Sequence, residues 1–239
     1  RRGNSQLTDN SKVEIMDMPG TYSLTPESLD EKIVAQQTLK WLNGINRPAV
    51  IISVVDAGNL SRNLYLTSQV MELGIPVIIA LNMMDSLKRN NQELDSQKLK
   101  KMLGVQAVVP MSALEKWGIN ELQSELSNVI SKEKNNSSSH IQMEIPEEIR
   151  KIINPISKFL HNKYEHNNYI TNVHALRLIT RKSAFDLYSE SENLNDAEIK
   201  SLKSLRDNAA HKIDKLGLNH RILEATLRFE MLDNSLKEI

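Results

Sequence analysis

In the first half of the chain, short runs of apolar residues alternate with longer stretches in which apolar and polar positions recur with helical spacing. The apolar runs predict buried strands over residues 13–17, 49–57, 76–82 and 107–113. The stretches between and after them predict helices over residues 27–42, 62–73, 96–103 and 118–130. Strands that recur with helices between them are typical of βαβ crossovers, which build a parallel sheet covered on both faces. This pattern predicts an α/β domain.

The second half has helical periodicity throughout. Apolar residues at helical spacing predict helices near 149–160, 172–188, 196–216 and 220–237. Between the halves lies SKEKNNSSSH (131–140), a polar run rich in Ser and Asn that is typical of a linker. We therefore expect an α/β domain over 1–131, a linker over 132–146 and a small helical domain over 147–239.

Composition narrows the classes of function. Thirty Lys and Arg residues balance thirty Asp and Glu residues, so the net charge is zero and no strong field attracts polyanions. We therefore expect no nucleic-acid partner. The absence of cysteine excludes disulfides, zinc ribbons and a cysteine nucleophile within these residues. The longest apolar runs are too short to cross a bilayer, and no targeting segment is visible.

Polar residues gather where the predicted strands end, at Asp17, Asp56, Asn82, Asp85 and Ser112. In open parallel sheets, ligands bind at the carboxyl ends of the strands. These positions are therefore the candidates for a binding site. We interpret Asp56 as a carboxylate that orders its loop rather than as a catalytic group.

The sharpest local motif is DMPG at 17–20, directly after a predicted strand. The Asp17 carboxylate would hold Mg²⁺ through a water molecule, as in a nucleoside-triphosphate switch. With Pro19 before it, the amide of Gly20 can approach a γ-phosphate closely because no side chain intervenes. The same four residues are also good turn chemistry, so the motif alone is weak.

A second motif, NMMD at 82–85, has the N-x-x-D spacing that reads guanine. The Asp85 carboxylate would accept hydrogen bonds from N1–H and the exocyclic amine of guanine, whereas adenine would leave it unpaired. Asn82 would contact the base edge and tie its loop to neighbouring loops. Met83 stands where a lysine is usual, and its thioether can still cover a base face.

The third motif is SAL at 112–114, where Ser112 and Ala113 would offer a backbone amide to guanine O6. Each motif alone is weak, but all three occur in the order and spacing of a guanine-nucleotide domain, and each closes a predicted strand. Together they predict a GTPase-type domain of the P-loop NTPase (Ras-like) fold that binds GTP or GDP.

Longer segments carry a family resemblance. The runs MDMPGTYSLTPESLDEKIVAQQ (16–37), VVDAGNLSRNLYLTSQVMELGIPVIIALNMMD (54–85) and LGVQAVVPMSALEKWGINEL (103–122) resemble the bacterial ferrous iron transport protein B (FeoB) family. The second half resembles that family's helical domain. There LRFEML (227–232) takes the place of a recurrent Arg-Tyr-x-x-Ile element, with Arg228 and Phe229 in its first two positions.

The resemblance implies a slow, Mg²⁺-dependent GTPase at the cytoplasmic face of the bacterial inner membrane. It would be coupled to iron(II) import by a membrane domain of the same full-length protein, and its helical domain would favour the GDP-bound state. Potassium is a further candidate cofactor, and a homo-oligomer is a candidate assembly. Residues 21–30 would form switch II, ordered by the γ-phosphate. No side chain is an evident catalytic base, and we assign no catalytic residue.

The sequence departs from the family in one respect, because no G-x-x-x-x-G-K-[ST] motif occurs in these 239 residues. That loop supplies most phosphate contacts and a Mg²⁺ ligand. We therefore expect the 239 residues by themselves neither to bind GTP tightly nor to hydrolyse it. Residues upstream, an interrupted gene and a natural pseudo-GTPase remain as explanations, of which we favour the first. The alternative function is a nucleotide-free module for protein interaction.

The same departure affects the expected sheet. The strand that precedes the phosphate-binding loop would lie at the centre of the sheet. Without that strand, the strands on either side of it should have unpaired edges. The polar residues before Asp17 are expected to form a hairpin with the strand that leads into it.

Overall fold

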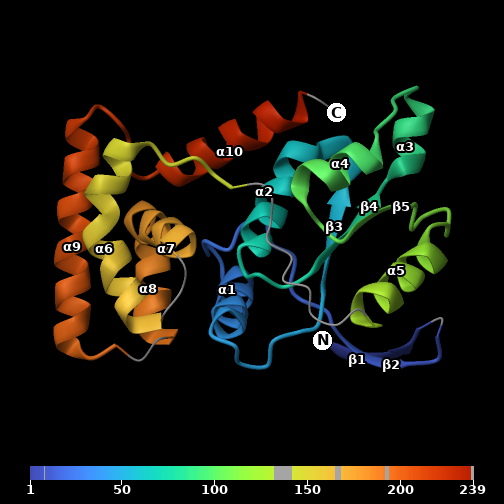
Figure 1. Cartoon of the computed structure of the whole chain (residues 1–239), viewed down its shortest axis with the longest axis horizontal. Coiled ribbons are helices and arrows are strands. Elements are labelled where there is room, and N and C mark those ends of the chain that lie inside the picture. Colours follow the sequence, from blue (N-terminus) through green and yellow to red (C-terminus); the bar gives the residue numbers. More distant parts are fainter. Residues whose placement is uncertain (8, 132–141, 165–167, 192–193, 238–239) are drawn as a thin grey trace. The chain divides into compact units, whose positions relative to one another are not determined.

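The structure is a computed structural model that describes residues 1–7, 9–131, 142–164, 168–191 and 194–237 (Figure 1). Its elements divide between two compact units. The first unit comprises Arg1–Ser23, Lys40–Gln142 and Leu232–Ile239, and the second comprises Leu24–Leu39 and Met143–Met231. Each unit is described by itself below.

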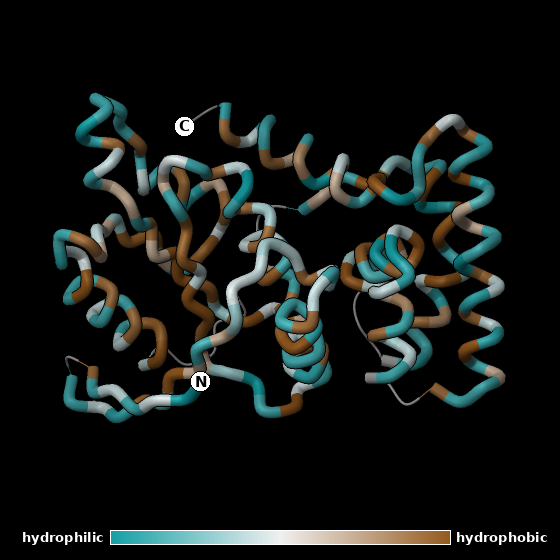
Figure 2. The backbone as a smooth tube through the Cα atoms, turned by 180° about the vertical axis from the view of Figure 1, so that it is seen from behind, coloured by the Kyte–Doolittle hydropathy of each residue, from teal (hydrophilic) through white to brown (hydrophobic). Residues whose placement is uncertain are grey.

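Three parallel strands form the main sheet of the first unit, in the order β3 (Ile51–Asp56), β4 (Val77–Asn82) and β5 (Ala107–Pro110). The residues of β4 from Val77 to Leu81 are all buried, as expected for a central strand of a covered parallel sheet. Figure 2 shows these strands as a hydrophobic band. The predicted α/β arrangement with a parallel sheet is therefore confirmed.

Helices alternate with these strands. The helical elements of this unit are η1 (Ala57–Asn59), α2 (Leu60–Met71), α3 (Met84–Arg89), α4 (Ser96–Leu103) and α5 (Ile119–Ser131). Of these, α3 is a six-residue helix that the sequence pattern does not predict. The core under α5 joins Leu7, Ile78, Ala107, Val109 and Leu126.

The strand predicted over 13–17 forms as β2 (Lys12–Met16), but it is not part of the parallel sheet. It pairs antiparallel with β1 (Arg2–Gln6), which is the hairpin expected before Asp17. The prediction that this strand joins the parallel sheet is wrong for the described residues. Among them, no further strand pairs with both β2 and β3 to connect the hairpin to the sheet. Accordingly β3 is an edge strand, and Val54 on it is 66% exposed.

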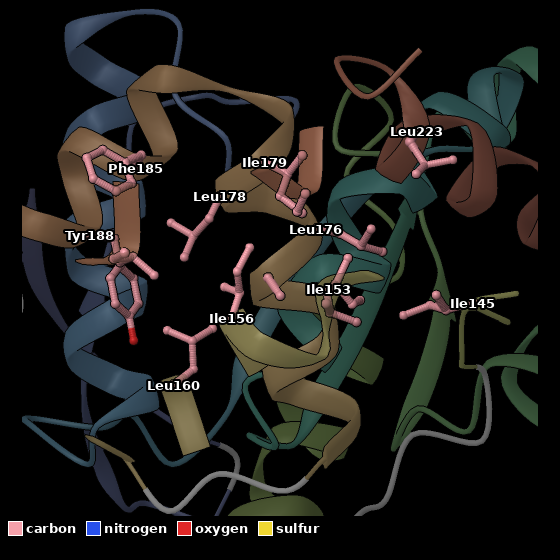
Figure 3. Close-up of a cluster of buried hydrophobic side chains, with 14 of the residues drawn as sticks. Ile145, Ile153, Ile156, Leu160, Leu176, Leu178, Ile179, Phe185, Tyr188 and Leu223 are labelled. Carbon is pink, nitrogen blue, oxygen red and sulfur yellow. The ribbon is translucent and has the colours of Figure 1, made fainter. Parts of the chain in front are cut away.

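The second unit is helical, as predicted. Its helices are α6 (Glu147–Tyr164), α7 (Asn168–Thr180), α8 (Lys182–Ser191), α9 (Asp196–Lys215) and α10 (Leu223–Leu236), whose last residues belong to the first unit. The single helix expected over 172–188 is two helices that break at Arg181. Their buried side chains form one continuous core with those of α6, including Ile153, Ile156 and Leu176 (Figure 3).

An ion cluster is buried in this unit. The Arg228 guanidinium is 1% exposed, and it donates from Nε to Glu224 at 2.8 Å. Arg177 lies 3.8 Å from the same carboxylate. Removing one partner of such a buried pair leaves a desolvated charge uncompensated. Arg228, singled out in the LRFEML segment, therefore has a packing role at this position.

Helix α1 (Leu29–Leu42) begins inside the segment predicted as switch II, residues 21–30. Its Ala35 and Leu39 lie in the core of the helical unit. Ion pairs from Lys32 to Glu190 at 2.8 Å and from Arg181 to Glu27 at 2.9 Å support the same grouping.

The contact pattern thus divides the chain differently from the predicted boundaries of 1–131, 132–146 and 147–239, which stay a prediction. Residues 132–141 of the expected linker lie outside the described residues. Among the described helices, none is both long enough and apolar enough to cross a bilayer.

Candidate functional site

Three loops meet at the carboxyl ends of the parallel strands. In the sheet register, Asp56 at the end of β3 lies opposite Asn82 at the end of β4. Leu81 lies opposite Pro110, so the loop after β5 begins at the same edge. We call residues 82–85 and 112–118 the base loops. The parallel sheet therefore brings the predicted guanine-reading residues of β4 and β5 together.

The two base loops are tied to each other. The Asn82 side-chain Oδ1 accepts a hydrogen bond from the backbone N–H of Ala113 at 2.9 Å. A second hydrogen bond runs from the Met84 N–H to the carbonyl of Met111, the residue directly before the other base loop, at 3.3 Å. Asn82 is thus bonded to the neighbouring loop in the way its interpretation from sequence requires.

Asp85 lies in the first turn of α3, and its side chain is only 3% exposed. Its Oδ2 accepts a hydrogen bond from the guanidinium of Arg89, whereas Oδ1 is buried without a hydrogen-bond partner among the described residues. The Ser112 side chain, the backbone N–H of Asp85 and Arg89 all lower the pKa of Asp85, Ser112 most strongly, while burial acts in the opposite direction. Asp85 is therefore a carboxylate at neutral pH with one acceptor atom unused.

The second base loop is closed on itself. Ser112 is fully buried, its Oγ accepts from the Glu115 N–H at 3.1 Å, and its backbone exchanges hydrogen bonds with Trp117. Gly118 follows in a left-handed conformation with φ of 86°. A Cβ at Gly118 would lie 2.4 Å from the Cβ of Met111, so only glycine fits.

Met83 adopts a left-handed backbone conformation with φ of 65°, and 46% of its surface is exposed. A non-glycine residue in this region is strained, and such strain often occurs at functional sites. The Met83 side chain is exposed beside the base loops, and its covering of a base face stays a prediction.

Asp56 has the loop-ordering role that we expect from the sequence. Its two carboxylate oxygens accept from the Gly58 N–H at 2.8 Å and from the Asn59 side chain at 2.7 Å. Both acceptor atoms are thereby used to cap η1.

The DMPG segment, residues 17–20, lies apart from the base loops in its bonding. The backbone of Asp17 pairs with Arg1 at 2.7 and 2.8 Å, but its side chain is exposed and has no hydrogen bond or ion pair among the described residues. Gly20 is exposed, and an added Cβ there would have no atom within 4 Å. Pro19 is half-buried. No described hydrogen bond joins this segment to the base loops.

The residues present fit the base of a guanine nucleotide better than its Mg²⁺-bound phosphates. The unused, buried Oδ1 of Asp85 is an acceptor of the kind that guanine N1–H and its amine require. The exposed Asp17 carboxylate is of the hard oxygen type that Mg²⁺ prefers, but one carboxylate alone does not define a metal site. Among the described residues, no cluster of three or more acidic or histidine side chains could hold a metal ion.

Two residues, one in the base loops and one in helix α3 beside them, emerge only from the structure. Gly118 could have been suspected from its place just after a strand and loop, but its close approach to Met111 is a tertiary contact. Arg89 stands four residues after Asp85, a spacing that places two helical side chains side by side.

Comparisons with known proteins agree with this geometry. The sequence model of the family described as ferrous iron transport protein B matches residues 1–126. The Fe(2+) transporter FeoB of Legionella pneumophila strain Paris is 43% identical over 118 residues, which are 48% of this chain and 15% of that protein. The corresponding transporter of Salmonella typhimurium is 41% identical over 127 residues, 52% of this chain and 16% of that protein. The chain thus spans a small part of the length of these curated relatives.

Solved structures extend the likeness over both units. The cytosolic domain of L. pneumophila FeoB is 29% identical with a TM-score of 0.72, covering 99% of this chain and 83% of that one. S. thermophilus NFeoB bound to GDP.AlF4- and K+ is 25% identical with a TM-score of 0.72, covering 98% and 84%. The matched family model covers more than half of the residues, and the chain belongs to the ferrous iron transport protein B family.

Proposed function

We propose that this chain is the guanine-nucleotide-binding region of a FeoB-type ferrous iron transporter. In the natural protein that carries it, GTP binding and slow, Mg²⁺-dependent hydrolysis would be coupled to iron(II) uptake through a membrane domain. The observation that carries the proposal is the buried, ionised Asp85 with its unused Oδ1, held beside the Asn82–Ala113 bond. Family membership and the K+- and GDP.AlF4--bound relative support it.

Each base-loop residue has a role in this proposal. Asp85 accepts hydrogen bonds from the two guanine donors, and Asn82 holds the loop of Ser112 and Ala113 against the base edge. Met83 covers one base face. Because adenine lacks these donors, it would leave a buried carboxylate unpaired, which is a strong basis for discrimination.

The phosphate end is proposed from the DMPG segment. Asp17 would hold Mg²⁺ through water, and the Gly20 amide would face the γ-phosphate. When bound, Mg²⁺ would neutralise developing charge on the phosphates. We assign no catalytic base, and K+ is proposed as a further cofactor on the basis of the K+-bound relative. The proposed place of work is the cytoplasmic face of the bacterial inner membrane.

A displacement titration tests this function. The natural protein is loaded with fluorescent GDP, and unlabelled GDP and ADP are added as competitors in the presence of Mg²⁺. The proposal predicts displacement by GDP and none by ADP at the same concentration. No binding by folded protein would contradict it and would favour the module for protein interaction, for which the missing G-x-x-x-x-G-K-[ST] motif is the supporting observation.

A further inference from the structure

Arg89 occupies an acceptor atom that the proposed ligand needs. Helix α3 places Arg89 one turn after Asp85, and its guanidinium donates to Asp85 Oδ2 while approaching Ser86 Oγ at 3.4 Å. The other carboxylate oxygen, Oδ1, is buried without a hydrogen-bond partner among the described residues. The carboxylate therefore has only one oxygen available as long as the Asp85–Arg89 pair is formed.

Guanine requires more than one oxygen. Its N1–H and its exocyclic amine are adjacent donors that a carboxylate accepts best with both oxygens, in the bidentate manner of an arginine–carboxylate pair. The Arg89 guanidinium is itself such a donor. Arginine and guanine are thus chemically equivalent partners for the same carboxylate, and the two cannot both use Oδ2 fully.

We propose that Arg89 is an internal competitor of the guanine base, which lowers the affinity of the site for guanine nucleotides through its ion pair with Asp85. This inference rests on the proposed function and concerns the regulation of the same site. Arg89 is a positioning residue, because it acts on the nucleotide only through Asp85.

The burial of the two partners makes the competition reversible. The Arg89 side chain is 64% exposed and can move into solvent at little desolvation cost to itself, whereas the Asp85 side chain is 3% exposed and keeps its charge buried, ready for the guanine donors. The apparent affinity for guanine nucleotides is then the intrinsic affinity multiplied by the fraction of time for which the Asp85–Arg89 pair is open. We expect removal of Arg89 to tighten GDP binding by roughly two- to fivefold.

Inosine diphosphate separates competition from a general structural effect. Hypoxanthine keeps N1–H but lacks the exocyclic amine, so it requires only one carboxylate oxygen and leaves the other to Arg89. Loss of Arg89 should therefore strengthen binding of GDP but leave binding of inosine diphosphate nearly unchanged. A merely structural role of Arg89 would change both affinities by the same factor.

The experiment measures both affinities by displacement of fluorescent GDP from the natural protein and its Arg89→Ala and Arg89→Gln variants. Lys98→Ala is the control, since it removes the same charge from an exposed position of α4 that has no described side-chain contact. The expected result is a higher ratio of GDP to inosine diphosphate affinity in both Arg89 variants and an unchanged ratio in the control.

Three other results would overturn the inference. Weaker or unchanged GDP binding in the Arg89 variants would contradict competition while leaving the guanine site itself intact. Equal tightening of both nucleotides would assign Arg89 a structural role. Absence of GDP-specific binding in the unmodified protein would remove the proposed function and this inference together.

Discussion

The base loops and the DMPG segment belong to the same unit and follow strands, yet they are built in different ways. The base loops are cross-bonded through Asn82 and Ala113, and the side chain of Asp85 is buried within them. In the DMPG segment, the side chain of Asp17 is exposed and has no hydrogen bond among the described residues. The difference indicates that the fold itself holds the base loops in place, whereas no described hydrogen bond fixes the side chain of Asp17.

The sheet explains this difference. Parallel pairing aligns β3, β4 and β5 so that their carboxyl ends lie at one edge, and the loops after them can bond to one another. The strand before Asp17 pairs only with β1 among the described strands. It therefore lacks the alignment that places the other loops.

The largest expected effect comes from two glycine substitutions that contrast the regions. Gly118→Ala should lower the free energy of unfolding by about 2–4 kcal/mol, because a Cβ there meets Met111 and the backbone is left-handed. Gly20→Ala should change it by less than about 0.5 kcal/mol, because the position is open. Chemical denaturation of both variants measures the difference, and equal losses would mean that the DMPG segment is as tightly packed as the base loops.

An intermediate effect is expected from Asn82→Ala, which removes the acceptor for the Ala113 N–H. Loss of this link should weaken GDP binding by roughly fivefold, about 1 kcal/mol. The control is Asn128→Ala on the exposed face of α5, which should leave binding unchanged. Displacement titrations compare the two variants. If both bind GDP like the parent, the bond between the loops does not position the base.

The smallest effect is expected from Met83→Gly. In this variant of a base loop, the free energy of unfolding and the affinity for GDP should change in opposite directions. Glycine relieves the left-handed strain at this position, so the free energy of unfolding should rise by roughly 0.5 kcal/mol. Loss of the Met83 side chain should weaken GDP binding about threefold, because less apolar surface covers the base. A variant with a higher free energy of unfolding and unchanged or tighter GDP binding would show that Met83 does not contact the base.

The sequence predicts most of the strands and helices of this chain. Buried strands and amphipathic helices each have a characteristic spacing of apolar residues, and this spacing does not depend on distant contacts. The strand ends at Asn82 and Ser112 are visible in this way. The break between α7 and α8 at Arg181 has no glycine or proline to mark it. Helix α3 is a single short segment after a left-handed Met83, so its apolar period is too brief to detect.

Other features depend on tertiary packing. The grouping of α1 with the helical unit rests on the burial of Ala35 and Leu39 against side chains far along the chain. The pairing of β2 with β1 alone depends on which other strands are present beside it. Local sequence cannot specify either outcome.

In the proposed function Asp85 reads guanine, and the Asp85→Asn variant tests this role most directly. An amide in place of the carboxylate can donate to the 2-oxo group of xanthine but cannot accept both guanine donors. The natural protein carrying this substitution should therefore bind xanthosine diphosphate more tightly than GDP in displacement titrations, the reverse of the unmodified protein. A variant that folds and still prefers GDP would contradict the assignment of Asp85.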